Sequence, residues 1–282
     1  MIDTLVKYVK RKLERRRLKS TFKEYDYQVI RLELPQYGQI EVAQWLNPLL
    51  EKPYVVSIAD VNFYKEFTKE GDFIIDIGAH MGDMTLPMAL AVGKSGLVLA
   101  FDPNPIVYKI LEKNASLNRD KTNIDPYRLA IATNEGEYFY NSSEATFSNG
   151  GISAVENSPH GKYGLKEKIQ AVNLERFLNE KYQDRLSHLS LIKIDTEGLD
   201  IEIIKSIETV LTTYKPTVIF ECFKRLPAKD RYELYDSIQK KGYYLYYIEK
   251  FEADTHKVRL KREDMTNWKH FDIVATPFKW RE

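Results

Sequence analysis

Short apolar runs alternate with amphipathic segments from residue 72 onward, and this alternation limits the possible folds more than any other feature of the chain. The runs of strand length are DFIIDIG (72–78), GLVLAFDP (96–103), YRLAIA (127–132), LSLIKID (189–195) and PTVIFEC (216–222). Helical spacing of apolar residues predicts helices between them, over 83–92, 104–118 and 199–211. Apolar strands separated by helices indicate an α/β protein with a mostly parallel sheet and helices on both faces.

The two ends of the chain depart from this alternation. After a helix over 229–242, two strands over 243–249 and 271–277 leave little room for a crossover helix, so we expect an antiparallel last strand. Before residue 72, we predict strands over YQVIRLELP (27–35) and PYVVSIA (53–59). A helix over 60–69, capped by Asp60, is expected to follow them. We therefore divide the chain into a basic amphipathic helix (1–22), an N-terminal extension or cap (23–70) and a main domain (71–282).

The N-terminal segment concentrates positive charge. Residues 1–23 carry nine Lys and Arg against two acidic residues, so this segment is +7 and the rest of the chain −6. Apolar residues recur at helical spacing over 2–18. Two interpretations stay open: contact with a membrane surface or a partner through residues 1–19, or packing on the protein's own body or in a homo-oligomer. The acidic remainder makes nucleic acid an unexpected partner.

Composition fits an ordinary soluble globular protein, with 43% hydrophobic and 29% charged residues. Cys222 is the single cysteine, which excludes an internal disulfide and favours a reducing, cytoplasmic setting. No apolar run approaches the roughly 20 residues of a membrane span. The polar stretch 141–166 is the longest region without periodicity and is a candidate loop over the site.

The turn after the first main-domain strand, DIGAHMGD (76–83), predicts a cofactor site but not a dinucleotide site. A dinucleotide loop that begins at Gly78 would need glycines at 80 and 83, where this chain has His80 and Asp83. His80 adds a side chain where the backbone must approach a pyrophosphate, and Asp83 adds negative charge at the helix N-terminus. Both residues argue against NAD.

S-adenosylmethionine removes both objections, because it has no phosphate and carries positive charge. Asp76 and Asp83 then attract the ligand, and Asp102 at the end of the second strand can accept hydrogen bonds from ribose hydroxyls. The order strand, glycine loop, helix, strand, acidic residue therefore favours this cofactor.

Three blocks carry a family resemblance: DFIIDIGAHMGDMTLPMA (72–89), LAFDPNPIVYKILEKNASLN (99–118) and LIKIDTEGLDIEIIKSI (191–207). They resemble the FkbM family of S-adenosylmethionine-dependent methyltransferases over roughly residues 60–222. The resemblance implies the class I methyltransferase (Rossmann-like) fold, with a seven-stranded sheet, and methylation of hydroxyls of sugars, glycans or natural products. Asp102 stands where the family often has Glu, and DTEGLD (195–200) where DVEGAE is common.

We predict the following cofactor-binding residues: Asp76, Gly78, Ala79, His80, Gly82, Asp83, Thr85, Asp102, Pro103, Asn104, Ala130 and Asp195. For catalysis we select Asp195, Glu197 and Glu221, because they end or follow strands that face the predicted crevice. For Asp195 the open alternatives are a cap for the next helix and an anchor for the cofactor, and for Glu197 the alternative is a structural role in its turn. Asp195 with Glu221 could hold Mg²⁺, but the further carboxylates of such a site are not evident, so no metal is expected.

Two other functions compete with an O-methyltransferase acting on sugars, glycans or small molecules. Lys193, Asp195, Glu221 and Lys224 suggest the tetrad of RNA ribose 2′-O-methyltransferases, although Glu221 stands where a lysine would be expected. A non-catalytic scaffold that keeps the fold is the third hypothesis, and the intact acidic and glycine positions argue against it.

Overall fold

The large sheet forms the centre of the protein, shown by a computed structural model that describes residues 2–50, 53–156, 161–196 and 198–280. Its eight strands have the order β14-β13-β15-β12-β11-β3-β4-β5. Their bounds are β3 Phe73–Ile77, β4 Leu97–Phe101, β5 Ile124–Tyr127, β11 Leu189–Ile194, β12 Thr217–Cys222, β13 Tyr244–Ile248, β14 Lys257–Arg259 and β15 Phe271–Thr276. The neighbours from β12 to β5 pair in parallel, whereas β15 is antiparallel to β12 and to β13.

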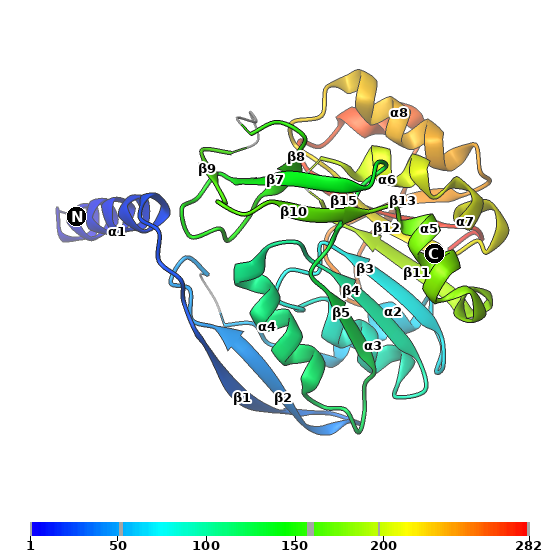
Figure 1. Cartoon of the computed structure of the whole chain (residues 1–282), viewed down its shortest axis with the longest axis horizontal. Coiled ribbons are helices and arrows are strands. Elements are labelled where there is room, and N and C mark those ends of the chain that lie inside the picture. The colour runs from blue at the N-terminus through cyan, green and yellow to red at the C-terminus, as the bar shows by residue number, and fades with distance from the viewer. Residues whose placement is uncertain (1, 51–52, 157–160, 197, 281–282) are drawn as a thin grey trace.

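Helices cover both faces of this sheet (Figure 1). Alternate residues of β3 divide between two cores: Ile74 packs with α2 (Ile58–Lys65), α3 (Thr85–Val92) and α4 (Pro105–Ser116). Phe73, Ile75 and Ile77 pack with the opposite set of helices. These are α5 Leu174–Lys181, α6 Asp200–Ser206, α7 Glu208–Thr213 and α8 Ala228–Gln239; the short 3-10 helices are η1 Gln183–His188 and η2 Arg262–Thr266. The predicted α/β class is therefore confirmed.

The order of the strands reverses between β3 and β11. From β3 the chain adds β4 and β5 on one side and later adds β11 and β12 on the other. In such sheets the crevice beyond the carboxyl ends at the reversal is the usual ligand site. Gly78, directly after β3, lies so close to the residue after β11 that a Cβ on it would be 1.9 Å from the Asp195 carbonyl oxygen.

A second, smaller sheet lies against this end of the molecule (Figure 1). It contains β6 Ala130–Ile131, β7 Gly136–Ser142, β8 Gly151–Ser153, β9 Tyr163–Gly164 and β10 Ile169–Val172. The polar stretch 141–166 therefore contains short strands as well as loops. It continues from the end of β7 to the region above the switch point.

The N-terminal segment contributes a helix and a hairpin. In Figure 1, α1 (Ile2–Ser20) projects from the body, and β1 (Tyr27–Leu34) and β2 (Gly38–Trp45) lie beside α4. Asn114 on α4 fixes the hairpin, because its side chain accepts from the Ala43 N–H at 2.7 Å and donates to the Ala43 carbonyl at 3.1 Å. Within the described part of the chain, no helix is long and apolar enough to cross a membrane.

Several predicted elements need correction. Residues 53–57 form no strand, and the following helix is capped by Ser57, with Asp60 three residues inside it completing a capping box. The segment 127–132 divides: Tyr127 ends β5, whereas Ala130 and Ile131 join the second sheet. The helix predicted over 199–211 breaks at Ile207 into α6 and α7, and the sheet has β14 as an eighth strand. The predicted Asn104 cap and Pro105 start of α4 are confirmed.

Replacing Gly78 by alanine should be far more damaging than replacing Gly38. Both glycines have positive φ, 77° and 66°, so both substitutions strain the backbone by about 1–3 kcal/mol. A Cβ at Gly38 has no atom within 4 Å, whereas at Gly78 it collides with the Asp195 carbonyl. We expect Gly78→Ala to lower the free energy of unfolding by at least about 2 kcal/mol more than Gly38→Ala, measured by urea denaturation. Equal losses would contradict this close approach between the ends of β3 and β11.

Candidate active site

A cavity of about 330 Å³ lies at the carboxyl ends of β3, β4 and β11. Its size falls within the usual range for small-molecule and cofactor sites. The wall comprises residues 77–80, Asp83, Met84, 101–103, 129–131, Tyr140, 148–152, Lys193, Asp195, Thr196, Leu199 and Phe251. The cavity therefore lies at the switch point, where the fold leads us to expect a ligand.

The loop after β3 has an unusual backbone that shapes one wall. His80 has φ 51°, a left-handed conformation that is uncommon for a residue with a side chain, and Gly82 has φ 88°. The His80 N–H donates to Asp102 Oδ2 at 2.8 Å. Its ring Nε2 lies 3.2 Å from the Ser148 carbonyl oxygen, and a carbonyl can only accept, so Nε2 carries the hydrogen. His80 thus joins the β3 loop to β4 and to the loop after β7.

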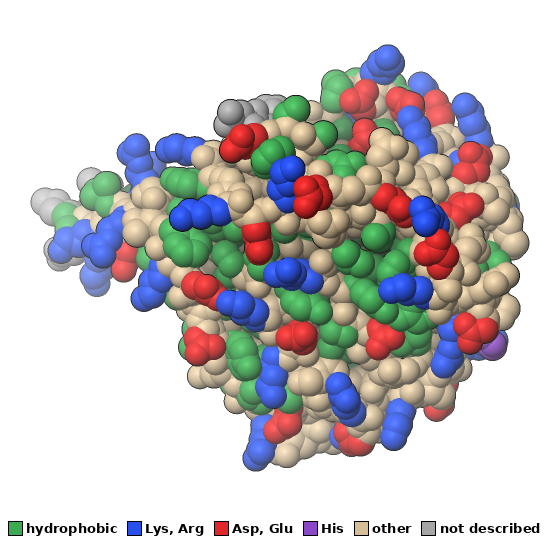
Figure 2. Space-filling view, viewed as in Figure 1, with side chains coloured by type: hydrophobic (Ala, Val, Ile, Leu, Met, Phe, Trp, Pro, Cys, Tyr) green, Lys and Arg blue, Asp and Glu red, His purple; other side chains and the backbone are tan. Residues whose placement is uncertain are grey.

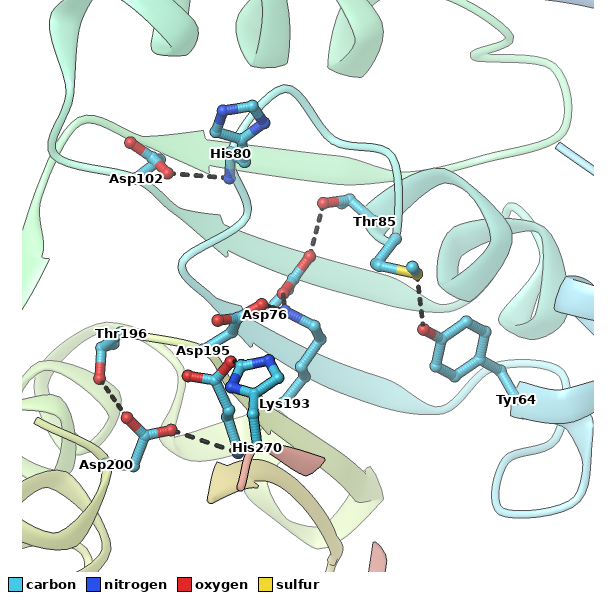
Figure 3. Close-up of polar contacts among 12 residues, drawn as sticks. Tyr64, Asp76, His80, Thr85, Asp102, Lys193, Asp195, Thr196, Asp200 and His270 are labelled. Atoms are coloured by element: carbon cyan, nitrogen blue, oxygen red, sulfur yellow. Dashed lines mark hydrogen bonds and ion pairs between the residues drawn. The ribbon is translucent and has the colours of Figure 1, made fainter. Parts of the chain in front are cut away.

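Asp102 is buried at the end of β4 (Figure 3), and both its oxygens are oriented by backbone donors. Oδ2 accepts from His80 N–H, and Oδ1 accepts from Asn104 N–H at 2.9 Å. Burial raises the pKa of Asp102 to about 6, although His80 and the two backbone hydrogen bonds oppose the rise. Each carboxylate oxygen has two acceptor positions, so the group can still accept from a ligand hydroxyl.

Lys193 lies between two carboxylates at the floor of the cavity (Figure 3). Its ammonium is 3.6 Å from Asp76 Oδ1 on β3 and 3.2 Å from Asp195 Oδ2 at the end of β11. Thr85 at the start of α3 donates to the other Asp76 oxygen at 2.6 Å. Burial alone would lower the pKa of Lys193, but Asp195 and Asp76 raise it above its ordinary value. Burial also raises the pKa of Asp76, against the effect of Lys193.

The structure separates the predicted cofactor residues into two groups. Those in the cavity wall are Gly78, Ala79, His80, Asp83, Asp102, Pro103, Ala130 and Asp195. The other four, Asp76, Gly82, Thr85 and Asn104, lie behind the wall and support it. Asn104, for example, caps α4 and donates to the Phe147 carbonyl at 2.7 Å. Cofactor binding by each residue stays a prediction.

Of the predicted catalytic residues that the structure describes, Asp195 lies in the cavity wall and Glu221 does not. Asp195 is in the cavity wall, and its side chain is 48% exposed. Glu221 is outside that wall and lies 2.9 Å from His270 Nε2 at the start of β15. Glu197 lies outside the described residues. The catalytic roles of all three stay predictions.

The structure adds wall residues that sequence analysis did not select. The second sheet contributes Tyr140 from β7 and residues 148–152 from the loop that leads into β8 and the start of β8. The turn after β13 contributes Phe251. Gly150 has φ 149°, and a Cβ there would collide with the Asn141 carbonyl, so this turn requires glycine at 150. The polar stretch 141–166, predicted as a loop over the site, contains residues 148–152, whereas no sequence signal marks Tyr140 or Phe251.

The cavity has the charge of a site for a cationic ligand. Asp83, Asp102 and Asp195 contribute carboxylates, whereas Lys193, the one lysine in the wall, is held by two acids. Apolar wall is supplied by Phe101, Leu129 and Ile131. No group of three or more His, Cys, Asp or Glu residues placed to hold a metal ion occurs in the described ranges.

The fold and site define an α/β protein with a cavity at the switch point of a doubly wound sheet. The FkbM methyltransferase domain matches residues 76–245, which is more than half of the chain. The chain therefore belongs to the FkbM family of methyltransferases, and the predicted family, enzyme class and fold class are confirmed.

Individual relatives are distant. Methyltransferase sdnD of Sordaria araneosa is 24% identical over 197 residues, covering 61% of this chain and 73% of the relative. A solved FkbM methyltransferase from Methylobacillus flagellatus is 13% identical, with a TM-score of 0.43 over 76% of this chain and 50% of that one. A solved SAM-dependent O-methyltransferase from Thermotoga maritima is 15% identical, with a TM-score of 0.39 over 90% and 79% of the two chains. The family assignment rests on the sequence match.

Replacing Lys193 should destabilise the fold, because a buried acid then loses its partner charge. Lys193→Met leaves Asp76 buried without its partner charge, and we expect a loss of about 3 kcal/mol in the free energy of unfolding. Adding Asp76→Asn should recover part of that loss, because no buried charge then remains. Lys205→Met, which removes an exposed lysine paired with Glu233, is the control and should change stability little. Additive losses in the double variant would show that the two buried groups are not coupled.

Cofactor affinity should depend on the ionisation of Asp102. Its pKa of about 6 means that the carboxylate is mostly protonated at pH 5 and ionised at pH 7. The ionised form is the better acceptor for ribose hydroxyls, so S-adenosylhomocysteine should bind more tightly as pH rises and level off above about 7, with at most about a tenfold change per pH unit. Calorimetric titrations of wild type and Asp102→Asn would check this. An equal pH dependence in the variant would assign the effect to another group.

Proposed function

We propose that the chain transfers a methyl group from S-adenosylmethionine to a hydroxyl oxygen of a sugar, glycan or small natural product. The observation that carries this proposal is Asp195, an exposed carboxylate in the cavity wall beside the glycine loop. Transfer to a hydroxyl needs an oriented acceptor and a group that takes up its proton. Asp195 is a carboxylate of the wall that can meet both needs.

The residues present fit this cofactor. Asp102 would hold the ribose hydroxyls, the apolar side chains Phe101 and Ile131 would pack against adenine, and Asp83 would attract the positive charge of the methionine end. The bound cofactor would supply a methyl group already activated by a positive sulfur. The protein therefore needs to exclude water and align the acceptor rather than activate the methyl group.

Lys193 gives Asp195 a fixed position for this role. Their 3.2 Å contact anchors one carboxylate oxygen at the floor of the cavity, while the exposure of the side chain leaves the other available to an acceptor. Asp195 would accept the hydrogen bond of the acceptor hydroxyl and take up its proton as the oxygen gains the methyl group.

The competing functions receive less support. Of the tetrad suggested for RNA methylation, Lys193 and Asp195 share the cavity wall, but Glu221 contacts His270 and the Lys224 ammonium lies over the Phe223 ring. A scaffold would have no use for a buried Asp102 whose pKa is raised by burial. Such costly groups are usually retained for binding or chemistry.

Replacing Asp195 should separate catalysis from cofactor binding. Asp195→Asn keeps the size of the side chain but removes the base, so we expect methyl transfer to fall about 10²–10⁴-fold. S-adenosylhomocysteine affinity should change much less. The assay offers isotopically labelled S-adenosylmethionine with a panel of sugars, glycans and hydroxylated small molecules, and locates the methyl group by mass spectrometry. Asp120→Asn, an exposed acid that precedes β5 at the end of the sheet opposite the cavity, is the matched control.

Two results would contradict the proposal. One is a methyl group found on nitrogen or carbon of the product. The other is undiminished transfer by Asp195→Asn to an acceptor whose deoxy analogue is inert, since the hydroxyl would then be methylated without this carboxylate.

A further inference from the structure

The projecting helix α1 turns its apolar stripe away from the body of the protein. Val6, Val9 and Leu13 are spaced along one face, and they are 44%, 45% and 60% exposed. The side of the helix that is partly buried carries Leu18 and Lys19 instead. Val9 and Leu18 are nine residues apart, about two and a half helical turns, so they lie on opposite faces. The stripe is therefore not used for packing on the body.

Cations flank this stripe on both sides. At about 100° per residue, Lys10 and Arg17 fall along one edge of it, and Lys12 and Arg16 along the other. The helix carries eight Lys and Arg and two acids over Ile2–Ser20. Figure 2 shows the Lys and Arg side chains gathered over the projecting helix. An exposed apolar stripe between two rows of cations is the pattern of helices that lie in a membrane interface.

We propose that α1 binds the surface of an anionic lipid bilayer, with Val6, Val9 and Leu13 inserted between headgroups. A second copy of the chain fits the stripe less well, because facing stripes would bring the flanking rows of cations together. A nucleic acid would use the cations but leave the stripe in water. An anionic bilayer would contact both the cations and the apolar stripe, since it offers an apolar layer directly beneath negative charge.

The helix is joined to the wall of the cavity. Lys19 lies 2.5 Å from Glu144, and the Lys19 carbonyl accepts from the Ala145 N–H at 2.8 Å. Ser148 in turn donates to Glu144, and its carbonyl accepts from His80 Nε2. Bilayer binding by α1 therefore holds the 144–152 segment, and with it one wall of the cavity, next to the membrane.

Vesicle sedimentation of the full chain tests this surface. The protein should bind vesicles of phosphatidylglycerol and phosphatidylcholine, bind pure phosphatidylcholine at least about tenfold less, and lose binding as salt rises. The double variant Val9→Gln/Leu13→Gln leaves every charge in place and should bind at least about tenfold less than wild type. Val29→Gln/Val55→Gln, at exposed apolar positions of the body, is the matched control and should bind like wild type.

Three outcomes would overturn the proposal: no binding to anionic vesicles, equal binding by the stripe variant, or a wild-type dimer by light scattering that the stripe variant dissociates. The third would assign the stripe to a subunit interface. S-adenosylhomocysteine titration of the same proteins keeps this test separate from the proposed reaction, because the stripe lies outside the cavity and the variants should keep wild-type affinity.

Discussion

The switch point depends on one buried cation. Lys193 lies between Asp76 on β3 and Asp195 at the end of β11, and the two strands are paired in parallel there. Without the ammonium, the buried Asp76 carboxylate would face the Asp195 carboxylate with no positive charge between them. With it, the two strand ends can approach closely enough for Gly78 to pack directly against the Asp195 carbonyl. The geometry of the glycine loop, and therefore the cavity itself, follows from this arrangement.

The same arrangement determines how charge is divided at the site. Lys193 is occupied by its two acids, so it presents little positive charge to a ligand, whereas Asp83 and Asp102 keep their carboxylates toward the cavity. Burial makes the Asp102 charge costly, as its raised pKa shows. A ligand with positive charge and hydroxyl donors offsets that cost, and a phosphate-bearing one would increase it. This is the physical reason for expecting S-adenosylmethionine rather than a dinucleotide at this site.

The sequence predicted the parts of the fold that local patterns determine. Buried parallel strands are continuous apolar runs, so β3, β4, β11 and β12 were placed within a residue or two, and Asn104 and Pro105 marked the start of α4. Long-range pairing has no such local signal. Ala130 and Ile131 look like the end of the preceding strand and join another sheet only because β10 passes beside them. Likewise, the wall residues 148–152 and Phe251 meet the glycine loop only in the folded chain.

The 144–152 segment connects features that the sequence presents as unrelated. Glu144 contacts Lys19 of α1, the Phe147 carbonyl accepts from Asn104 at the start of α4, and the Ser148 carbonyl accepts from His80 in the glycine loop. One segment therefore contacts the projecting helix, a helix of the main sheet and the loop beside Asp102. The position of this segment is therefore set jointly by α1, by the start of α4 and by the glycine loop, three parts of the chain that are far apart in the sequence.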